Sequence, residues 1–197
     1  KVISILLDDF SSVVTFYDHA KIDCGEAYLI RSNSYLLGSH LFQIKGCRNE
    51  LYFQITDITT GVIIKEYRVR HDEEITFSNT PLIQEKTNHD NEEELDKTKQ
   101  FLRRISTSDI GIAARFSQQS IELIIGGIKE IQQGGGGGFS ASPGSTISSP
   151  FGKVSTPSTN NYNATMYGYV NYANTRSVYF KSLFDSVLFN HIPGNVA

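Results

Sequence analysis

The sequence lacks several features on which common functions depend. It has no tryptophan, one methionine, two cysteines and five prolines among its 197 residues. A membrane-spanning helix needs about 18 consecutive apolar residues. The apolar segments at 3–7 and 121–125, each interrupted by one polar residue, are far shorter than that. We therefore expect a chain that does not span a membrane.

A strong excess of charge of one sign is also missing. The formal net charge is -3, and the only charged residues in 133–197 are Lys153, Arg176, Lys181 and Asp185. Neither part of the chain carries the basic stripe that is typical of nucleic-acid binding. We expect no nucleic-acid partner.

Motifs that would indicate catalysis are absent. None of the five histidines, His19, His40, His71, His89 and His191, lies four residues from another, and no Gly-x-Ser-x-Gly motif surrounds a serine. The glycines at 134–138 are not followed by the lysine and hydroxyl residue of a phosphate-binding loop. We expect no enzymatic activity, no cofactor and no metal.

Clusters of acidic residues leave open two exceptions to the expectation of no metal and no enzymatic activity. Solvated turns explain these clusters better than ligand sites do, because neighbouring residues on a strand point to opposite faces. A calcium site at 72–74 is one exception that we keep. A hydrolase that uses Asp18 and His19 is the other.

The two cysteines, Cys24 and Cys47, each lie beside a glycine, which suggests strand ends brought together by turns. We predict a disulfide between them and hence an oxidising compartment. Two buried reduced thiols are the alternative. A zinc site is disfavoured because neither cysteine has a second thiol or a histidine at ligand spacing.

The first part of the chain indicates strands. Residues 13–17, 27–31, 35–44, 51–55, 62–69, 75–77 and 110–116 are rich in β-branched, aromatic and other apolar residues. Residues 57–61 suit a hairpin connection between two of these strands. The fold class that we predict is mainly β (α+β), with residues 1–132 forming an antiparallel sandwich or meander.

We predict two helices within this body. Residues 92–105 have apolar residues at helical intervals, an N-cap candidate at Asn91, and glutamates where the helix dipole favours them. Residues 117–132 carry five isoleucines at spacings of three and four. The glycines at 126 and 127 weaken this second helix, so a strand with a bulge is the alternative.

A stretch rich in Gly, Ser, Thr and Pro follows the body. Residues 133–165 contain five consecutive glycines at 134–138, and Pro143, Pro150 and Pro157 follow at intervals of seven. Such a composition buries little apolar surface, so its default state is a flexible tether or an extended chain. We predict an extended linker here, and an uncommitted linker is the alternative to one that lies along another subunit.

The last segment, 166–197, is unusually aromatic. Its aromatic residues include Tyr167, Tyr169, Tyr172, Tyr179, Phe180, Phe184 and Phe189. The pattern suits a strand at 167–172 and a helix that begins near residue 174. We predict a docking arm that completes a neighbouring subunit, and the alternative is that it completes the core of its own body.

Together these features predict a non-enzymatic structural or accessory subunit. Its expected partners are other protein subunits, in a homo-oligomer or a multi-protein complex. Its expected location is extracellular, periplasmic or at the cell surface, with a virion as a further option. The alternative function is a glycan- or receptor-binding module that uses exposed tyrosines such as Tyr35, Tyr52 or Tyr67.

Overall fold

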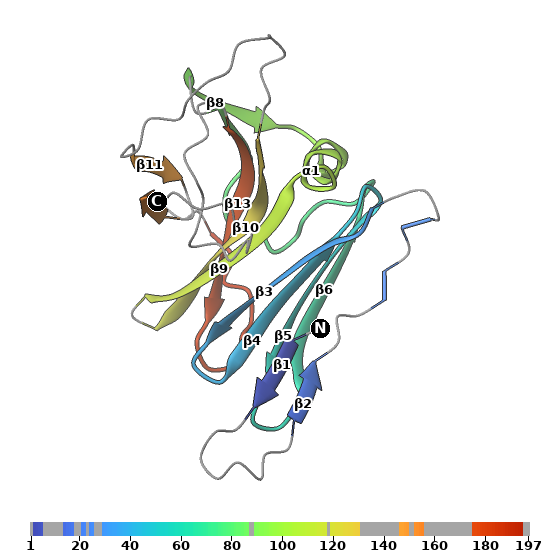
Figure 1. The fold of residues 1–197 in the computed structure, drawn as a ribbon, viewed down its shortest axis with the longest axis vertical. Coiled ribbons are helices and arrows are strands. Elements are labelled where there is room, and N and C mark those ends of the chain that lie inside the picture. Colours follow the sequence, from blue (N-terminus) through green and yellow to red (C-terminus); the bar gives the residue numbers. More distant parts are fainter. Residues whose placement is uncertain are drawn as a thin grey trace.

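The computed structural model describes residues 2–5, 14–17, 21–22, 24–25, 29–86, 89–117, 119–130, 146–149, 152–155 and 175–194. In these residues the fold is mainly β, with two antiparallel sheets that share one core and a short helix at one end (Figure 1). The predicted class of a mainly β body is therefore confirmed.

The first sheet is a four-stranded antiparallel meander in the order β3-β4-β5-β6. Its strands are β3 (Arg31–Leu37), β4 (His40–Gly46), β5 (Glu50–Asp57) and β6 (Ile63–Arg70). The single strand predicted over 35–44 is instead the hairpin of β3 and β4, because Gly38 adopts a φ of 59° and turns the chain. The hairpin connection predicted at 57–61 is present between β5 and β6.

The second sheet has five strands in the order β8-β7-β13-β10-β9. They are β7 (Leu82–Lys86), β8 (His89–Leu95), β9 (Asp109–Ser117), β10 (Ser120–Glu130) and β13 (Thr175–Asp185). The C-terminal strand β13 is the central strand, paired with β10 along its whole length and with β7 on its other side.

The core lies between the two sheets. Alternate residues of each strand face it, among them Phe42, Phe53, Ile112, Ile125 and Phe180, all of which are fully buried. One side of the sandwich is closed where β3 lies beside β9, and there Nδ2 of Asn33 donates to the carbonyl of Ile110 at 2.8 Å. Residues 75–77 are not a strand, although Ile75 and Phe77 do fill the core.

The first predicted helix is shorter than expected. Helix α1 spans Thr98–Ile105 and buries Phe101, Leu102 and Ile105. The glutamates before it belong to β8, where Glu93 pairs with Gln84 of β7. The cap predicted at Asn91 is wrong, because the helix begins after Lys97, which makes no side-chain cap. Sheet pairing has outweighed the local helical preference of the glutamate run.

The second predicted helix, over 117–132, is wrong. Of the described residues in this range, Ser117 ends β9 and Ser120–Glu130 form strand β10, so the strand alternative is correct for them. The strand pairs with β9 and β13 in one continuous register through Gly126 and Gly127, without the expected bulge. Its isoleucines imitate a helical stripe because both faces of β10 carry apolar residues, Ile121 and Ile125 on one and Ile124 and Ile128 on the other.

The helix predicted near residues 174–188 is also wrong, since β13 occupies this region. Residues 175–194 belong to the sandwich and do not form a separate unit. Two further antiparallel pairs are present, β1 (Val2–Ile5) with β2 (Val14–Tyr17), and β11 (Thr146–Ser149) with β12 (Gly152–Ser155). The rest of the predicted linker at 133–165 lies outside the described residues.

Candidate functional site

The two cysteines are joined in a disulfide. Cys24 and Cys47 lie with their Cα atoms 6.0 Å apart and both are buried. Cys47 stands in the turn between β4 and β5, so the bond ties the N-terminal segment to the first sheet. Because such bonds persist in oxidising surroundings, it favours a compartment of that kind.

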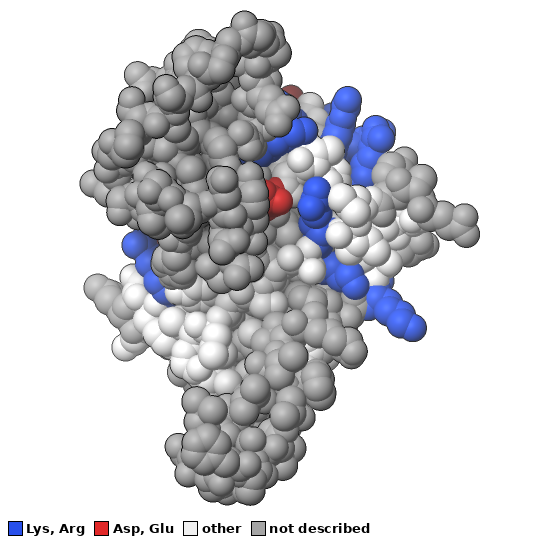
Figure 2. Space-filling view, in the orientation of Figure 1, with Lys and Arg blue, Asp and Glu red and all other residues white. Residues whose placement is uncertain are grey.

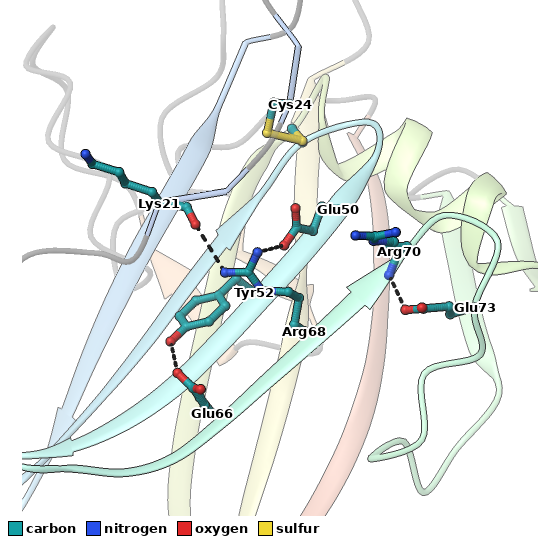
Figure 3. Close-up of polar contacts among 9 residues, drawn as sticks. Lys21, Cys24, Glu50, Tyr52, Glu66, Arg68, Arg70 and Glu73 are labelled. Carbon is teal, nitrogen blue, oxygen red and sulfur yellow. Dashed lines mark hydrogen bonds and ion pairs between the residues drawn. A yellow bond between two sulfur atoms is a disulfide. The ribbon is translucent and has the colours of Figure 1, made fainter.

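A polar network on the outer side of the first sheet reinforces this attachment (Figure 3). The hydroxyl of Tyr52 on β5 donates to Glu66 on β6 at 2.6 Å. The guanidinium of Arg68 lies 2.9 Å from Glu50 and donates to the carbonyl of Lys21 at 3.2 Å. Burial, followed by the bond to Glu66, raises the pKa of the Tyr52 hydroxyl. Through the bond from Arg68 to Lys21, this network attaches the N-terminal segment to the first sheet.

The predicted docking aromatics that the structure describes are part of the chain's own core. Phe180 and Phe184 are fully buried, and Tyr179 and Phe189 are nearly so. The ring of Phe180 lies 5.7 Å from that of Phe77, and the ring of Phe184 lies 6.0 Å from that of Phe53. The apolar surface of these four residues is thus covered in the sandwich, which agrees with the alternative that the segment completes its own body. The other three, Tyr167, Tyr169 and Tyr172, lie outside the described residues.

The acidic residues and histidines that the structure describes do not gather at one site. Within the described ranges, no group of three His, Cys, Asp or Glu side chains is placed to hold a metal ion. In the turn at 72–74, Glu73 accepts the backbone N–H of Arg70 at 2.8 Å. Asp18 and His19 are outside the described residues.

No helix in the described part of the chain has the length and apolarity needed to cross a membrane.

A different feature distinguishes the surface. Six large apolar side chains, each between 49% and 80% exposed, lie at the same end of the sandwich. They are Leu36, Val62, Ile63, Phe116, Val187 and Leu188. They belong to the β3–β4 hairpin, the β5–β6 turn, the β9–β10 hairpin and the loop after β13, which all lie at the end away from α1 (Figure 1). We call these four connections and their six apolar side chains the apolar end.

Contacts between the connections join them into one surface. The N–H of Ile58 donates to the carbonyl of Ser39 at 2.9 Å, which links the β5–β6 turn to the β3–β4 hairpin. The ring of Phe189 lies 4.5 Å from that of His40, at the start of β4. The N–H of Ser186 donates to the carbonyl of Gln119 at 3.2 Å, which links the last loop to the β9–β10 hairpin.

Two aspartates hold the backbone of this surface in place. Asp185 accepts the N–H groups of Val187, Leu188 and Asn190 at 3.1, 2.5 and 2.7 Å. These bonds, with that from Leu188 the strongest, hold the pKa of its carboxyl below the ordinary range. Asp57 caps the β5–β6 turn in the same way by accepting the N–H of Thr59 at 2.7 Å, and its pKa is lowered too.

The connections themselves carry no charge. Residues 34–39, 58–64, 116–121 and 186–190 contain no Asp, Glu, Lys or Arg. In the space-filling view, the described surface at the lower left, where the β3–β4 and β9–β10 hairpins lie, is largely white (Figure 2). The apolar end therefore combines exposed apolar side chains with connections that carry no charged residue.

Our sequence reasoning missed this surface, although a signal was present. Turns usually consist of Gly, Pro, Asn, Asp and Ser, because these residues suit turn geometry and water. Here the β5–β6 turn ends in Val62 and Ile63, and the loop after β13 contains Val187 and Leu188. We had placed the first pair in a strand and the second on a helix. Large apolar residues in two connections were therefore read as core.

Comparison with known proteins adds no assignment, since no protein-family model, curated protein or solved structure gives a significant match to this chain.

Proposed function

We propose that this chain is a non-enzymatic structural or accessory subunit of an extracellular, cell-envelope or virion assembly. It attaches to that assembly through the apolar end. This replaces the predicted C-terminal arm as the contact surface, because the described aromatics of that arm fill the chain's own core.

The observation that carries the proposal is the gathering of exposed apolar side chains at one end of the sandwich. Isolated exposed apolar residues are normal on a protein surface, but a cluster of them usually marks an interaction site. The four connections are joined by hydrogen bonds and a ring contact, so they present their side chains from a fixed frame. A fixed frame lowers the entropy lost on binding.

The charged edge strands of the two sheets favour binding through the apolar end over binding by strand addition. The edge strand β6 carries Lys65, Glu66, Arg68 and Arg70, and the edge strand β8 carries Glu92, Glu93 and Glu94. Charged side chains on an edge strand discourage pairing with another chain. Docking by strand addition therefore has less support than docking through the apolar end.

The alternative of a glycan- or receptor-binding module loses its expected contacts. Tyr52 is buried and its hydroxyl is bonded to Glu66. Tyr67 is half-buried, with its ring 4.7 Å from that of Phe77, and Tyr35 is packed against the core. None of the three offers the open ring face on which a sugar stacks.

Photo-crosslinking in the cells that make the protein tests the proposal. Leu188 and Leu29 are leucines of equal exposure, 63% and 62%, and Leu29 precedes β3 at the opposite end of the sandwich. With p-benzoylphenylalanine at either position, we expect adducts, to protein or to lipid, from position 188 and none from position 29. Absence of adducts at 188, or equal adducts at both positions, would contradict the proposal.

A further inference from the structure

We infer that the partner of the apolar end is the apolar layer of a lipid bilayer, into which the tips of the four connections insert from one side. The inference rests on the proposed function and names the partner at the same surface. Three properties of the apolar end favour lipid over a protein partner.

The first property is the kind of side chain present. The exposed residues are Leu, Val, Ile and Phe. Binding hot spots between proteins are enriched in Trp, Tyr and Arg, while Leu and Val are under-represented there. Aliphatic side chains instead gain most of their binding free energy from removal from water. A hydrocarbon layer provides this without matching their shape.

The second property is the state of the backbone. A polar group carried into lipid without a hydrogen-bond partner is costly, so segments that enter lipid must satisfy their groups internally. In the loop after β13, the N–H groups of Val187, Leu188 and Asn190 are all bonded to Asp185. This loop therefore presents its apolar side chains without exposing those donors.

The β5–β6 turn and the hairpin hydroxyls follow the same rule. The N–H of Gly61 donates to the carbonyl of Asp57 at 2.8 Å, and the N–H of Val62 donates to Oγ1 of Thr60 at 3.3 Å. The hydroxyls of Ser120 and Ser186 donate to backbone carbonyls at 2.8 and 3.0 Å. Much of the polar chemistry at these tips is thus already satisfied within the chain.

The third property is the distribution of charge. The four connections hold no charged residue, and the nearest acidic groups, Asp57 and Asp185, are engaged with their own turns. On β9 and β10, Arg115 is paired with Glu122 at 2.5 Å. Because the four connections contain no lysine or arginine, their contact with lipid should depend on neither anionic headgroups nor salt.

Flotation of the full chain with vesicles tests the inference. With phosphatidylcholine vesicles, we expect binding that is equal at low and high salt and is not increased by added phosphatidylserine. The double variant Val187→Ser, Leu188→Ser should bind at least roughly tenfold more weakly than the parent chain, because two aliphatic side chains no longer gain free energy by transfer to lipid. The matched control Leu29→Ser should bind like the parent chain.

Three results would overturn the inference. The parent chain could fail to float with phosphatidylcholine vesicles, the two variants could bind equally, or binding could require phosphatidylserine and disappear in salt. If position 188 nevertheless forms protein adducts in the crosslinking experiment, the proposed function stands and only the lipid partner is wrong. Circular dichroism of each variant establishes that it is folded before binding is compared.

Discussion

Glu130 and Thr175 are directly paired, as the last residue of β10 and the first residue of β13. The chain therefore leaves the sheet and returns to it at the same point. In the sequence, residues 131–174 are inserted between two directly paired strands. This relationship explains how a Gly-rich stretch and an aromatic segment coexist, since the aromatics after the insertion complete the sheet that precedes it.

Strand β13 should accordingly be essential for the fold of its own chain. Replacing Phe180 with Ala removes a fully buried ring that lies 5.4 Å from Phe101 and 5.7 Å from Phe77. We expect the free energy of unfolding to fall by about 3–5 kcal/mol. Leu188→Ala, on the same terminal segment but exposed, should change it by less than about 0.5 kcal/mol. Urea unfolding measures both, and equal effects would contradict the placement of β13.

The disulfide should contribute measurably to stability. It closes a loop with a sequence separation of 23 between Cys24 and Cys47. The chain-entropy relation gives about 3 kcal/mol for a loop of this size. The variant with both cysteines changed to serine should melt at a lower temperature than the parent. A reducing agent should lower the melting temperature of the parent and leave that of the variant unchanged. A parent whose melting temperature does not respond would indicate that the thiols are not bonded.

Acid should weaken the loop after β13 through Asp185. Its carboxyl has a pKa below the ordinary value of 3.8 because it accepts backbone N–H groups, chiefly that of Leu188. Its stabilising effect is complete above the pKa of the unfolded chain and is lost as the pH falls through the lower folded pKa. The parent should therefore be more stable than Asp185→Asn at pH 6, and the difference should vanish in strong acid.

A separate group, His191, titrates at higher pH. Burial lowers its pKa below 6.5, so the unfolded chain takes up a proton first and stability falls as the pH drops below that value. Because Asp185→Asn keeps His191, this decline should appear in both proteins. Urea unfolding from pH 8 downwards separates the two effects. A constant difference between parent and variant at every pH would mean that Asp185 does not cap the loop.

Much of the body could be predicted because its strands alternate clearly. In β5, Leu51, Phe53 and Ile55 face the core, as period two requires, and the hairpin that follows was marked by turn residues. The disulfide was also predicted from the glycine beside each cysteine, although only Cys47 lies at a strand end. Local pattern was sufficient wherever one face of a strand is apolar and the other is polar.

The errors arose where local pattern is ambiguous. Strand β10 is apolar on both faces, and its glycines, which weakened the helix prediction, mark a close approach between strands. A Cβ atom at Gly126 would lie 2.7 Å from that of Tyr179, the residue opposite it on β13. The return of β13 to the sheet depends on pairing with residues far earlier in the chain, which composition does not reveal. The apolar end was missed because it forms only when four distant connections meet.

The most direct test replaces residues 131–174 with the two-residue turn Asn-Gly, which joins Glu130 to Thr175 as a tight hairpin. Because β13 already lies beside β10 of its own chain, the shortened protein should fold, with circular dichroism typical of β-structure and the light-scattering mass of a single chain. A protein that fails to fold, or that forms only an exchanged dimer, would show that β13 belongs to a neighbouring chain and would contradict the account.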